Sequence, residues 1–536
     1  MYSVNEDIVR HSIKYLKKDL KDDWYCDPQN YKDIFSDISK LVAKINNKII
    51  KGNGIYMADE SFLFNIPKGN GGFRYTLEVC PIDRIAYHVF GIELIYLLDK
   101  TLPFNILGHR KSLDDETLFK PVIEQWNKFE NYTRISGKEK FIIETDITNY
   151  YDSIEIGVLK KELINSASTA RLSPDNFIRC HFFIESIYNI LRSISFNGKK
   201  GLPQNRDISS FLANIYMKSL DKCLEGVVYY RYMDDIRIVA NTRADANKYM
   251  LIVVGALREI GLAINSSKTR ILDPDSENHK KYCAEIDLET KKIDVLVNSG
   301  KRKYVLESFH EIFPKVIRYI EEGNIYERKF RFYANRLIIF FNAKDVRVPA
   351  KYKKILSEKL IGGINSRPDC ADQICALVQA IGSYKQLQDN LSEWVINKDN
   401  LTFEWAVYLV LRTLVSQGYK SRKLTDFCKG QFNDETSSIA IRGISSIYLN
   451  VRVTDEVIKK LAIENNFFLK RHYLISLSKC SRYKIKKNQF AIPLNEEILN
   501  DHSELYKLSG DKDFSFVRQS EKQSQRVLIK ELCDYA

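Results

Sequence analysis

The fold of this chain is decided by a short stretch that reads YYRYMDDIRIVA at residues 229–240. Two runs rich in β-branched and aromatic residues, Val227–Tyr232 and Ile236–Ala240, flank Met233-Asp234. This spacing predicts a β-hairpin with a two-residue tip. Adjacent aspartates at such a tip repel each other, and a divalent cation would relieve the repulsion, because Mg²⁺ favours carboxylate oxygen. The pattern Tyr-x-Asp-Asp also arises by chance, so its meaning depends on the segments around it.

An earlier acidic segment, FIIETDITNYYDSI at residues 141–154, places Asp146 directly after an apolar strand. Such a strand delivers a carboxylate to its carboxyl end. The alternative is a solvated strand-end residue or a helix N-cap, and Asp146 alone does not distinguish the two. Two more segments continue the order along the chain. GLPQNRDISSFLANIYM at residues 201–217 is a turn followed by a helix, and GLAINSSKTR at residues 261–270 follows a predicted helix.

The ordered set resembles the palm of reverse transcriptases. Its members are motif A at Asp146–Ile154, motif B at Gly201–Met217, motif C at Tyr232–Asp235 and motif D at Gly261–Thr269. Upstream, PKGNGGFR at residues 67–74 and PIDRI at residues 81–85 are similar to the fingers of group II intron and retron-type enzymes. The resemblance covers about residues 60–275.

The resemblance implies phosphoryl transfer assisted by two Mg²⁺ ions, for which Mn²⁺ can substitute, with dNTPs as substrates and DNA as product. It assigns catalysis and metal binding to Asp146, Asp234 and Asp235. The backbone carbonyl of Ile147 would be a further metal ligand.

The resemblance also implies a set of nucleotide-binding residues. Lys68 and Arg74 would neutralise the triphosphate, and the Tyr151 ring would block a 2′-hydroxyl and so favour dNTPs. Gln204 would contact the incoming nucleotide or the template, and Lys268 would donate a proton to pyrophosphate. Solvated surface cations are the alternative for Lys68 and Arg74. For Lys268 the alternative is a stem that covers helix surface.

Motif B departs from the family pattern, in which glycine follows Pro-Gln, because residues 203–207 read PQNRD. Loss of the glycine removes conformational freedom at a loop beside the template, and Arg206 and Asp207 add charge there. We therefore expect nucleotide addition to be kept, and templated copying to be less secure.

Beyond about residue 300, strand signals nearly vanish and helical patterns recur between short polar breaks. Examples are Tyr304–Glu322, Lys351–Ile361, Ala371–Tyr384, Phe403–Val415, Ser437–Tyr448 and Asp455–Asn465. A divergent HEAT-like array is one interpretation, and an irregular helical bundle is the other. The predicted fold class is α+β, with right-hand polymerase fingers and palm followed by an all-α HEAT-like repeat domain. The predicted domains are an N-terminal helical segment at 1–60, fingers and palm at 61–295, and the helical domain at 296–536.

A palm joined directly to a long helical half resembles the bacterial abortive-infection and defence-associated reverse transcriptases. The resemblance implies antiviral defence, homo-oligomeric assembly, and DNA synthesis that is untemplated and primed by a protein tyrosine. None of the 31 tyrosines can be chosen as the primer. Two alternatives stay open. One is templated, retron- or intron-like synthesis on a non-coding RNA, and the other is a catalytically silent palm that serves as an RNA-binding scaffold.

The composition of the chain bears on its cellular location and on its classes of partner. Lys and Arg number 82 and Asp and Glu 69, a net charge of +13, which suits either ordinary solubility or a basic groove for a polyanion. The ten cysteines form no CxxC pair, which disfavours a disulfide scaffold or a structural zinc site. No apolar run approaches the ~20 residues of a membrane helix, and the first residues lack a secretion signal. We expect a cytoplasmic protein with no membrane partner.

Overall fold

The computed structural model describes residues 2–20, 23–59, 61–69, 71–284, 288–298, 302–343, 348–450, 454–478, 480, 485 and 496–509. Their contacts divide the chain into two compact units. The first unit comprises Met1–Cys26, Ile34–Phe64 and Tyr75–Ile286, and the second comprises Asp27–Asp33, Asn65–Arg74 and Asp287–Ala536. None of the helices in the described part of the chain combines the length and apolarity that a membrane crossing requires.

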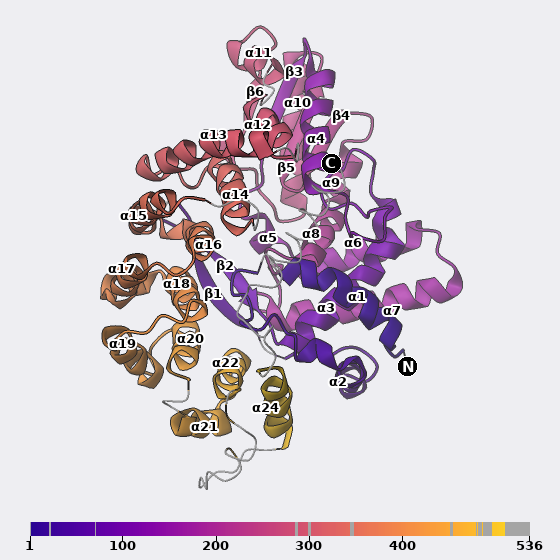
Figure 1. Ribbon diagram of the computed structural model, residues 1–536. Helices are drawn as coiled ribbons and strands as arrows, with labels where there is room; N and C mark the ends of the chain where they lie inside the picture. Colours follow the sequence, from indigo (N-terminus) through magenta and orange to yellow (C-terminus); the bar gives the residue numbers. More distant parts are fainter. Residues whose placement is uncertain are drawn as a thin grey trace. The chain divides into compact units, whose positions relative to one another are not determined.

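The first unit contains a four-stranded antiparallel sheet in the order β4-β5-β3-β6 (Figure 1). Its strands are β3 (Phe141–Thr145), β4 (Val228–Tyr232), β5 (Asp235–Ala240) and β6 (Arg270–Leu272). The predicted hairpin is confirmed, since Tyr232 pairs with Asp235 around the Met233-Asp234 tip. Ile142 and Ile143 point to opposite faces and are both fully buried, so side chains cover both faces of the sheet.

Eleven helices of the described residues belong to the first unit. They are α1 (Glu6–Asp19), α2 (Ile38–Lys51), α3 (Pro81–Leu98), α4 (Val122–Gly137), α5 (Tyr150–Ser153), α6 (Ile156–Thr169), α7 (Pro174–Ile194), α8 (Asp207–Tyr216), α9 (Lys218–Cys223), α10 (Arg243–Glu259) and α11 (Glu277–Ala284). Helices α4 and α10 contact the sheet. Between motif A and Ser195 the chain forms three separate helices, α5, α6 and α7.

The second unit is built mainly from helices in two layers (Figure 1). Within each layer, every second helix along the chain contacts the next one. One row consists of α13, α15, α17 and α19, and the other row consists of α14, α16, α18, α20, α22 and α24. Their bounds are α12 (Leu288–Asn298), α13 (Arg302–Glu321), α14 (Arg328–Asn342), α15 (Ala350–Ser366), α16 (Ala371–Ile381), α17 (Lys385–Ile396), α18 (Glu404–Ser416), α19 (Arg422–Asn433), α20 (Ile439–Leu449), α21 (Thr454–Ile463), α22 (Phe467–Leu477) and α24 (Glu496–Ser509).

Two segments from early in the sequence also belong to the second unit. Asp27–Asp33 is held by Arg471 of α22, whose Nε lies 2.6 Å from Asp27 Oδ2 and whose Nη2 lies 2.7 Å from Asp33 Oδ1. The other is the turn between β1 (Phe62–Pro67) and β2 (Phe73–Glu78). These long-range contacts carry no local sequence signal, and the sequence did not predict them.

Candidate active site

Two neighbouring strands bring the predicted catalytic aspartates together. Asp146 directly follows β3, and Asp235 begins β5. Because Thr145 pairs with Ile236, Asp146 and Asp235 occupy the next position of the same ladder, where paired Cα atoms lie roughly 4.5–5.5 Å apart. Asp234 lies in the hairpin tip and directly follows Met233 in the sequence. The φ of Met233 is 57°, a left-handed conformation that is uncommon for methionine.

The carboxylates of this group repel one another in a buried setting. Burial and the neighbouring charges of Asp146 and Asp235 raise the pKa of Asp234 to about 7. Oδ1 of Asp146 is buried and accepts no hydrogen bond from the described residues, whereas Oδ2 accepts one from Lys268 Nζ. A buried orphan oxygen among mutually repelling carboxylates is a donor set that fits a divalent cation.

The third carboxylate lies less deep. The Asp235 side chain is 34% exposed, and Nη1 of Arg237 lies 3.7 Å from its Oδ1. Arg237 also pairs with Glu144, its Nε 2.9 Å from Oε1. Within the described residues, the three aspartates do not bring one oxygen each within 4.8 Å of the others. The protein's own cations, Lys268 and Arg237, hold two of these carboxylates.

Motif D fixes the backbone beside Asp146. Asn265 N donates to the Asp146 carbonyl at 2.7 Å, and Thr148 N donates to the Ala263 carbonyl at 2.9 Å. These two bonds form an antiparallel bridge between Ile147 and Ile264. The bridge leaves the Ile147 carbonyl outside its hydrogen bonds, and the metal-ligand role of that carbonyl stays a prediction.

Motif B closes onto motif A. The hydroxyls of Tyr151 and Ser210 are hydrogen-bonded at 2.9 Å, and burial raises the pKa of Tyr151. Gln204 Nε2 donates to Asp152 Oδ1 at 2.6 Å, and Leu202 N donates to the Tyr151 carbonyl at 3.0 Å. Both predicted nucleotide-binding residues of this region are therefore positioned by contacts between the two motifs.

The structure corrects the expectation for the altered motif B loop. Asn205 keeps the left-handed conformation that glycine favours, with φ of 57°, and asparagine tolerates this region better than most residues. Arg206 is only 4% exposed, ion-paired with Asp23, and its Nη2 lies 3.2 Å from Glu78 Oε2. Asp19 Oδ1 caps the start of α8 by accepting a hydrogen bond from Asp207 N at 3.0 Å. The Arg206 charge therefore points into a buried ion cluster, rather than adding charge beside a template.

The predicted triphosphate ligands Lys68 and Arg74 belong to the second unit. Lys68 N donates to the Gly72 carbonyl at 2.7 Å and closes the β1–β2 turn. Gly69 approaches Arg367 so closely that a Cβ would lie 2.1 Å from Nη2. Their nucleotide-binding role stays a prediction.

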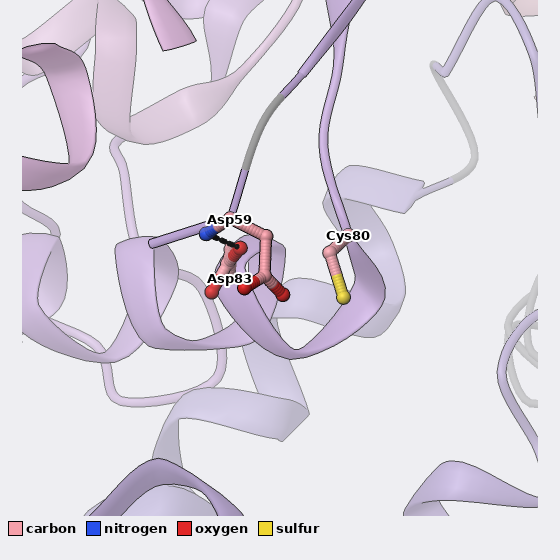
Figure 2. A group of neighbouring side chains, drawn as sticks. All are labelled: Asp59, Cys80 and Asp83. Carbon is pink, nitrogen blue, oxygen red and sulfur yellow. Dashed lines mark hydrogen bonds between the residues drawn. The ribbon is translucent and has the colours of Figure 1, made fainter. Parts of the chain in front are cut away.

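The first unit contains a second acidic group, which the sequence analysis did not predict. Ligand atoms of Asp59, Cys80 and Asp83 lie within 4.8 Å of one another (Figure 2). Lys48 Nζ lies 2.7 Å from Asp59 Oδ2 and 2.8 Å from Asp83 Oδ1. Tyr56 OH at 2.6 Å and Asp59 N at 2.8 Å also donate to Asp83.

The chemistry of this second group does not fit a metal. Lys48 already supplies the positive charge, and each Asp83 oxygen accepts a hydrogen bond. Burial and the Asp83 charge raise the pKa of the Cys80 thiol to about 12, and only a thiolate binds metal well. Asp83 and Arg84 of the PIDRI segment therefore have structural roles. Asp83 is held within this group, and Arg84 forms an ion pair with Asp19, in which Arg84 Nη2 lies 2.5 Å from Asp19 Oδ2.

Comparison with known proteins bears on the chemistry of the first site. Residues 66–298 match the family model described as reverse transcriptase (RNA-dependent DNA polymerase). The chain carries a reverse transcriptase domain. By this domain the protein is an RNA-directed DNA polymerase, a nucleotidyltransferase. The matched residues include motifs A to D and the β1–β2 hairpin from residue 66.

Other comparisons add less. No curated protein matches the chain. Among solved structures, telomerase from Candida albicans in complex with a TWJ fragment of telomeric RNA is 13% identical, covers 68% of this chain and 68% of its own, and has a TM-score of 0.32. Apo telomerase from Candida tropicalis is also 13% identical, covers 81% and 74%, and has the same TM-score of 0.32.

Proposed function

We propose that the reverse transcriptase domain adds dNTPs to a growing DNA end, with Asp146, Asp234 and Asp235 as its catalytic and metal-binding residues. The observation that carries this proposal is the β3–β5 register, which continues from Thr145–Ile236 to the two carboxylate-bearing positions. The raised pKa of Asp234, to about 7, supports it, because one proton or a cation must offset the crowded charge.

The donor set fits Mg²⁺, or Mn²⁺ in its place, held by the three aspartates and the Ile147 carbonyl. Bound there, two such ions would activate the attacking hydroxyl and neutralise the leaving pyrophosphate. The residues of the chain would do the rest. Asn265 and Thr148 orient the backbone at Asp146, and Lys268, whose side chain is 65% exposed, can deliver a proton to the leaving group.

Nucleotide selection is proposed for Tyr151 of motif A and Gln204 of motif B. Tyr151, fixed through its hydroxyl by Ser210, would exclude a 2′-hydroxyl, and Gln204, fixed by Asp152, would contact the nucleotide or the template. Lys68 and Arg74 are proposed to neutralise the triphosphate. Their support is the likeness of PKGNGGFR, residues 67–74, to the fingers of related enzymes.

The biological setting that we propose is bacterial anti-phage defence of the abortive-infection type, in the cytoplasm and as a homo-oligomer. It rests on the resemblance of a palm followed directly by a long helical half. The two rows of helices in the second unit support a HEAT-like arrangement. Within this setting, untemplated synthesis primed by a tyrosine is the first proposal.

Templated synthesis on a non-coding RNA is the second candidate, and two observations favour it. Asn205 has a left-handed φ of 57°, which a glycine at this position could also adopt, and Arg206 is buried and so adds no charge beside a template. Sequencing the product made with and without added RNA separates the two modes. A product sequence dictated by the RNA supports the second, and an RNA-independent product supports the first.

The core proposal is tested with the double variant Asp234→Asn/Asp235→Asn. We expect labelled dNTP incorporation in Mg²⁺ to be lost while the thermal unfolding midpoint does not fall. Asp275→Asn, which neutralises an exposed carboxylate of the same unit, is the matched control and keeps full incorporation. Incorporation retained by the double variant would refute the assignment of the site.

A further inference from the structure

A fully buried arginine stands next to the catalytic hairpin tip. Arg231 lies in β4, three residues before Asp234, and its exposure is 0%. A guanidinium withdrawn from water is costly unless its donors are paired. Two donors form a bidentate pair with Asp221 of α9, from Nε to Oδ1 at 3.1 Å and from Nη2 to Oδ2 at 2.8 Å.

The third nitrogen of the Arg231 guanidinium, Nη1, is aimed at the tip, while Nη2 also donates to the Asn214 carbonyl at 3.4 Å. Nη1 donates to Asn214 Oδ1 at 2.7 Å and to the Met233 carbonyl at 3.3 Å. That carbonyl belongs to the peptide group that joins Met233 to Asp234, so its direction sets the start of Asp234. Met233 is 6% exposed and has a left-handed φ of 57°, a conformation that a methionine holds only when its surroundings impose it.

The surroundings of Arg231 are themselves fixed. Its backbone N donates to the Asn105 carbonyl at 3.1 Å, and its carbonyl accepts from Leu107 N at 2.9 Å. Asn214, in the helix of motif B, donates through Nδ2 to the Gly108 carbonyl at 2.7 Å. A Cβ on Gly108 would lie 3.2 Å from Met233 Cγ, so the methionine side chain rests on this glycine.

We propose that Arg231 is a positioning residue, which orients the Met233–Asp234 peptide so that the Asp234 carboxylate meets Asp146 in a cation-binding geometry. The inference rests on the proposed function of the aspartates. It goes beyond it by coupling motif C to the motif B helix through one guanidinium, clamped between Asp221 and Asn214. An ion cluster that served stability alone would not change cation affinity in the folded protein.

The test is Arg231→Lys, which keeps the charge and loses the planar fork. Binding of Mn²⁺ alone to the full chain is followed by the electron paramagnetic resonance signal of free Mn²⁺. We expect Mn²⁺ affinity to fall about tenfold and kcat for incorporation to fall about tenfold, with the KM for dNTP nearly unchanged, because preorganised groups act on the transition state. Phe183→Leu, in the buried core of α7, is the control that lowers stability without changing Mn²⁺ affinity.

A second variant keeps the inference falsifiable if Arg231→Lys does not fold. Asn214→Ser retains Arg231 and removes the side chain that aims Nη1, and we expect Mn²⁺ affinity to fall about threefold. Wild-type Mn²⁺ affinity in either folded variant overturns the inference. Failure of the proposed function looks different, since Asp234→Asn would then leave Mn²⁺ binding and incorporation unchanged in the parent protein.

Discussion

The first unit holds two groups of acidic residues that differ in what neutralises them. In the group of Asp59, Cys80 and Asp83, Lys48 and Tyr56 satisfy Asp83, and the ligand atoms are closely spaced. In the group of Asp146, Asp234 and Asp235, no described residue donates a hydrogen bond to Oδ1 of Asp146, and burial and the neighbouring carboxylates raise the pKa of Asp234 to about 7. Close spacing alone does not make a metal site. What matters is which carboxylate oxygens the protein itself leaves unsatisfied.

The largest expected effect separates the two groups by activity. Asp234→Asn removes one proposed metal ligand, and we expect dNTP incorporation to fall by about a thousandfold or more, since a lost transition-state interaction of ~4 kcal/mol has this effect. The same variant should unfold at a slightly higher temperature, because it relieves repulsion in the site. Incorporation assays and calorimetry measure both. A variant that stays active, or loses stability, would erase the difference between the groups.

The second prediction addresses stability. Asp83→Ala leaves Lys48 without its fully buried partner, and breaking a buried pair of this kind costs about 3–5 kcal/mol of unfolding free energy. Urea unfolding measures the loss. Asp275→Asn, on the exposed surface, should change stability by less than about 0.5 kcal/mol. If the chelator EDTA destabilised Asp146→Asn, which lacks the proposed catalytic cation, as much as Asp83→Ala destabilises the parent, the Asp59–Cys80–Asp83 group would be a metal site after all.

The third prediction concerns ligand-induced stability. Mn²⁺ at about 100 times its dissociation constant should stabilise the wild type by about 2.7 kcal/mol. This gain should vanish in Asp146→Asn and persist in Lys48→Met, whose change lies in the other group. Thermal shift with and without Mn²⁺ measures it. A gain lost in Lys48→Met but kept in Asp146→Asn would reverse the assignment of the two groups.

The fourth prediction uses the buried ion cluster around Arg206 as a third case. Burial lowers the pKa of His88 to about 3, and Asp19 and Arg84 face its ring. The unfolded chain, with a pKa near 6.5, binds the extra proton first, so stability is full above about pH 6.5 and is lost as pH falls toward 3. Between pH 7 and 5 this costs about 2 kcal/mol.

His88→Gln should remove this contribution, so between pH 7 and 5 the unfolding free energy of the variant should fall by about 2 kcal/mol less than that of the parent protein. Burial alone would raise the pKa of the Asp19 carboxyl, but the nearby positive charge of Arg84 outweighs burial and lowers that pKa. Asp19 therefore adds little to the pH dependence of stability in this window. An unchanged slope between pH 7 and 5 in the variant would show that His88 is not the group that titrates.

The smallest effect is expected at the motif B loop. Asn205→Ala should cost about 1 kcal/mol of unfolding free energy, because its φ of 57° disfavours a Cβ without a local polar group, whereas Asn205→Gly should be nearly neutral. Urea unfolding of the two variants provides the comparison. Equal stability of the alanine and glycine variants would mean that the turn is not left-handed in solution.

Much of the first unit was predictable because its signals are local. The alternation in YYRYMDDIRIVA and the apolar run before Asp146 predicted β4, β5 and β3, and the structure contains all three strands. In the second unit, the six example patterns predicted helices, and the structure contains a helix at each of them, namely α13, α15, α16, α18, α20 and α21. The arrangement of helices in two rows depends on contacts between separate helices, and no local sequence pattern encodes it.

The sequence by itself determined which residue types stand at strand ends and turns, since these depend on neighbours two to four positions apart. That was enough to nominate the three aspartates and to predict the hairpin that carries two of them. Only the tertiary structure decided which charged side chains form ion pairs with each other inside the protein. The pairing of Arg206 with Glu78, of Lys48 with Asp83 and of Arg231 with Asp221 joins separate elements, and a buried charge is satisfied by whatever the fold brings beside it.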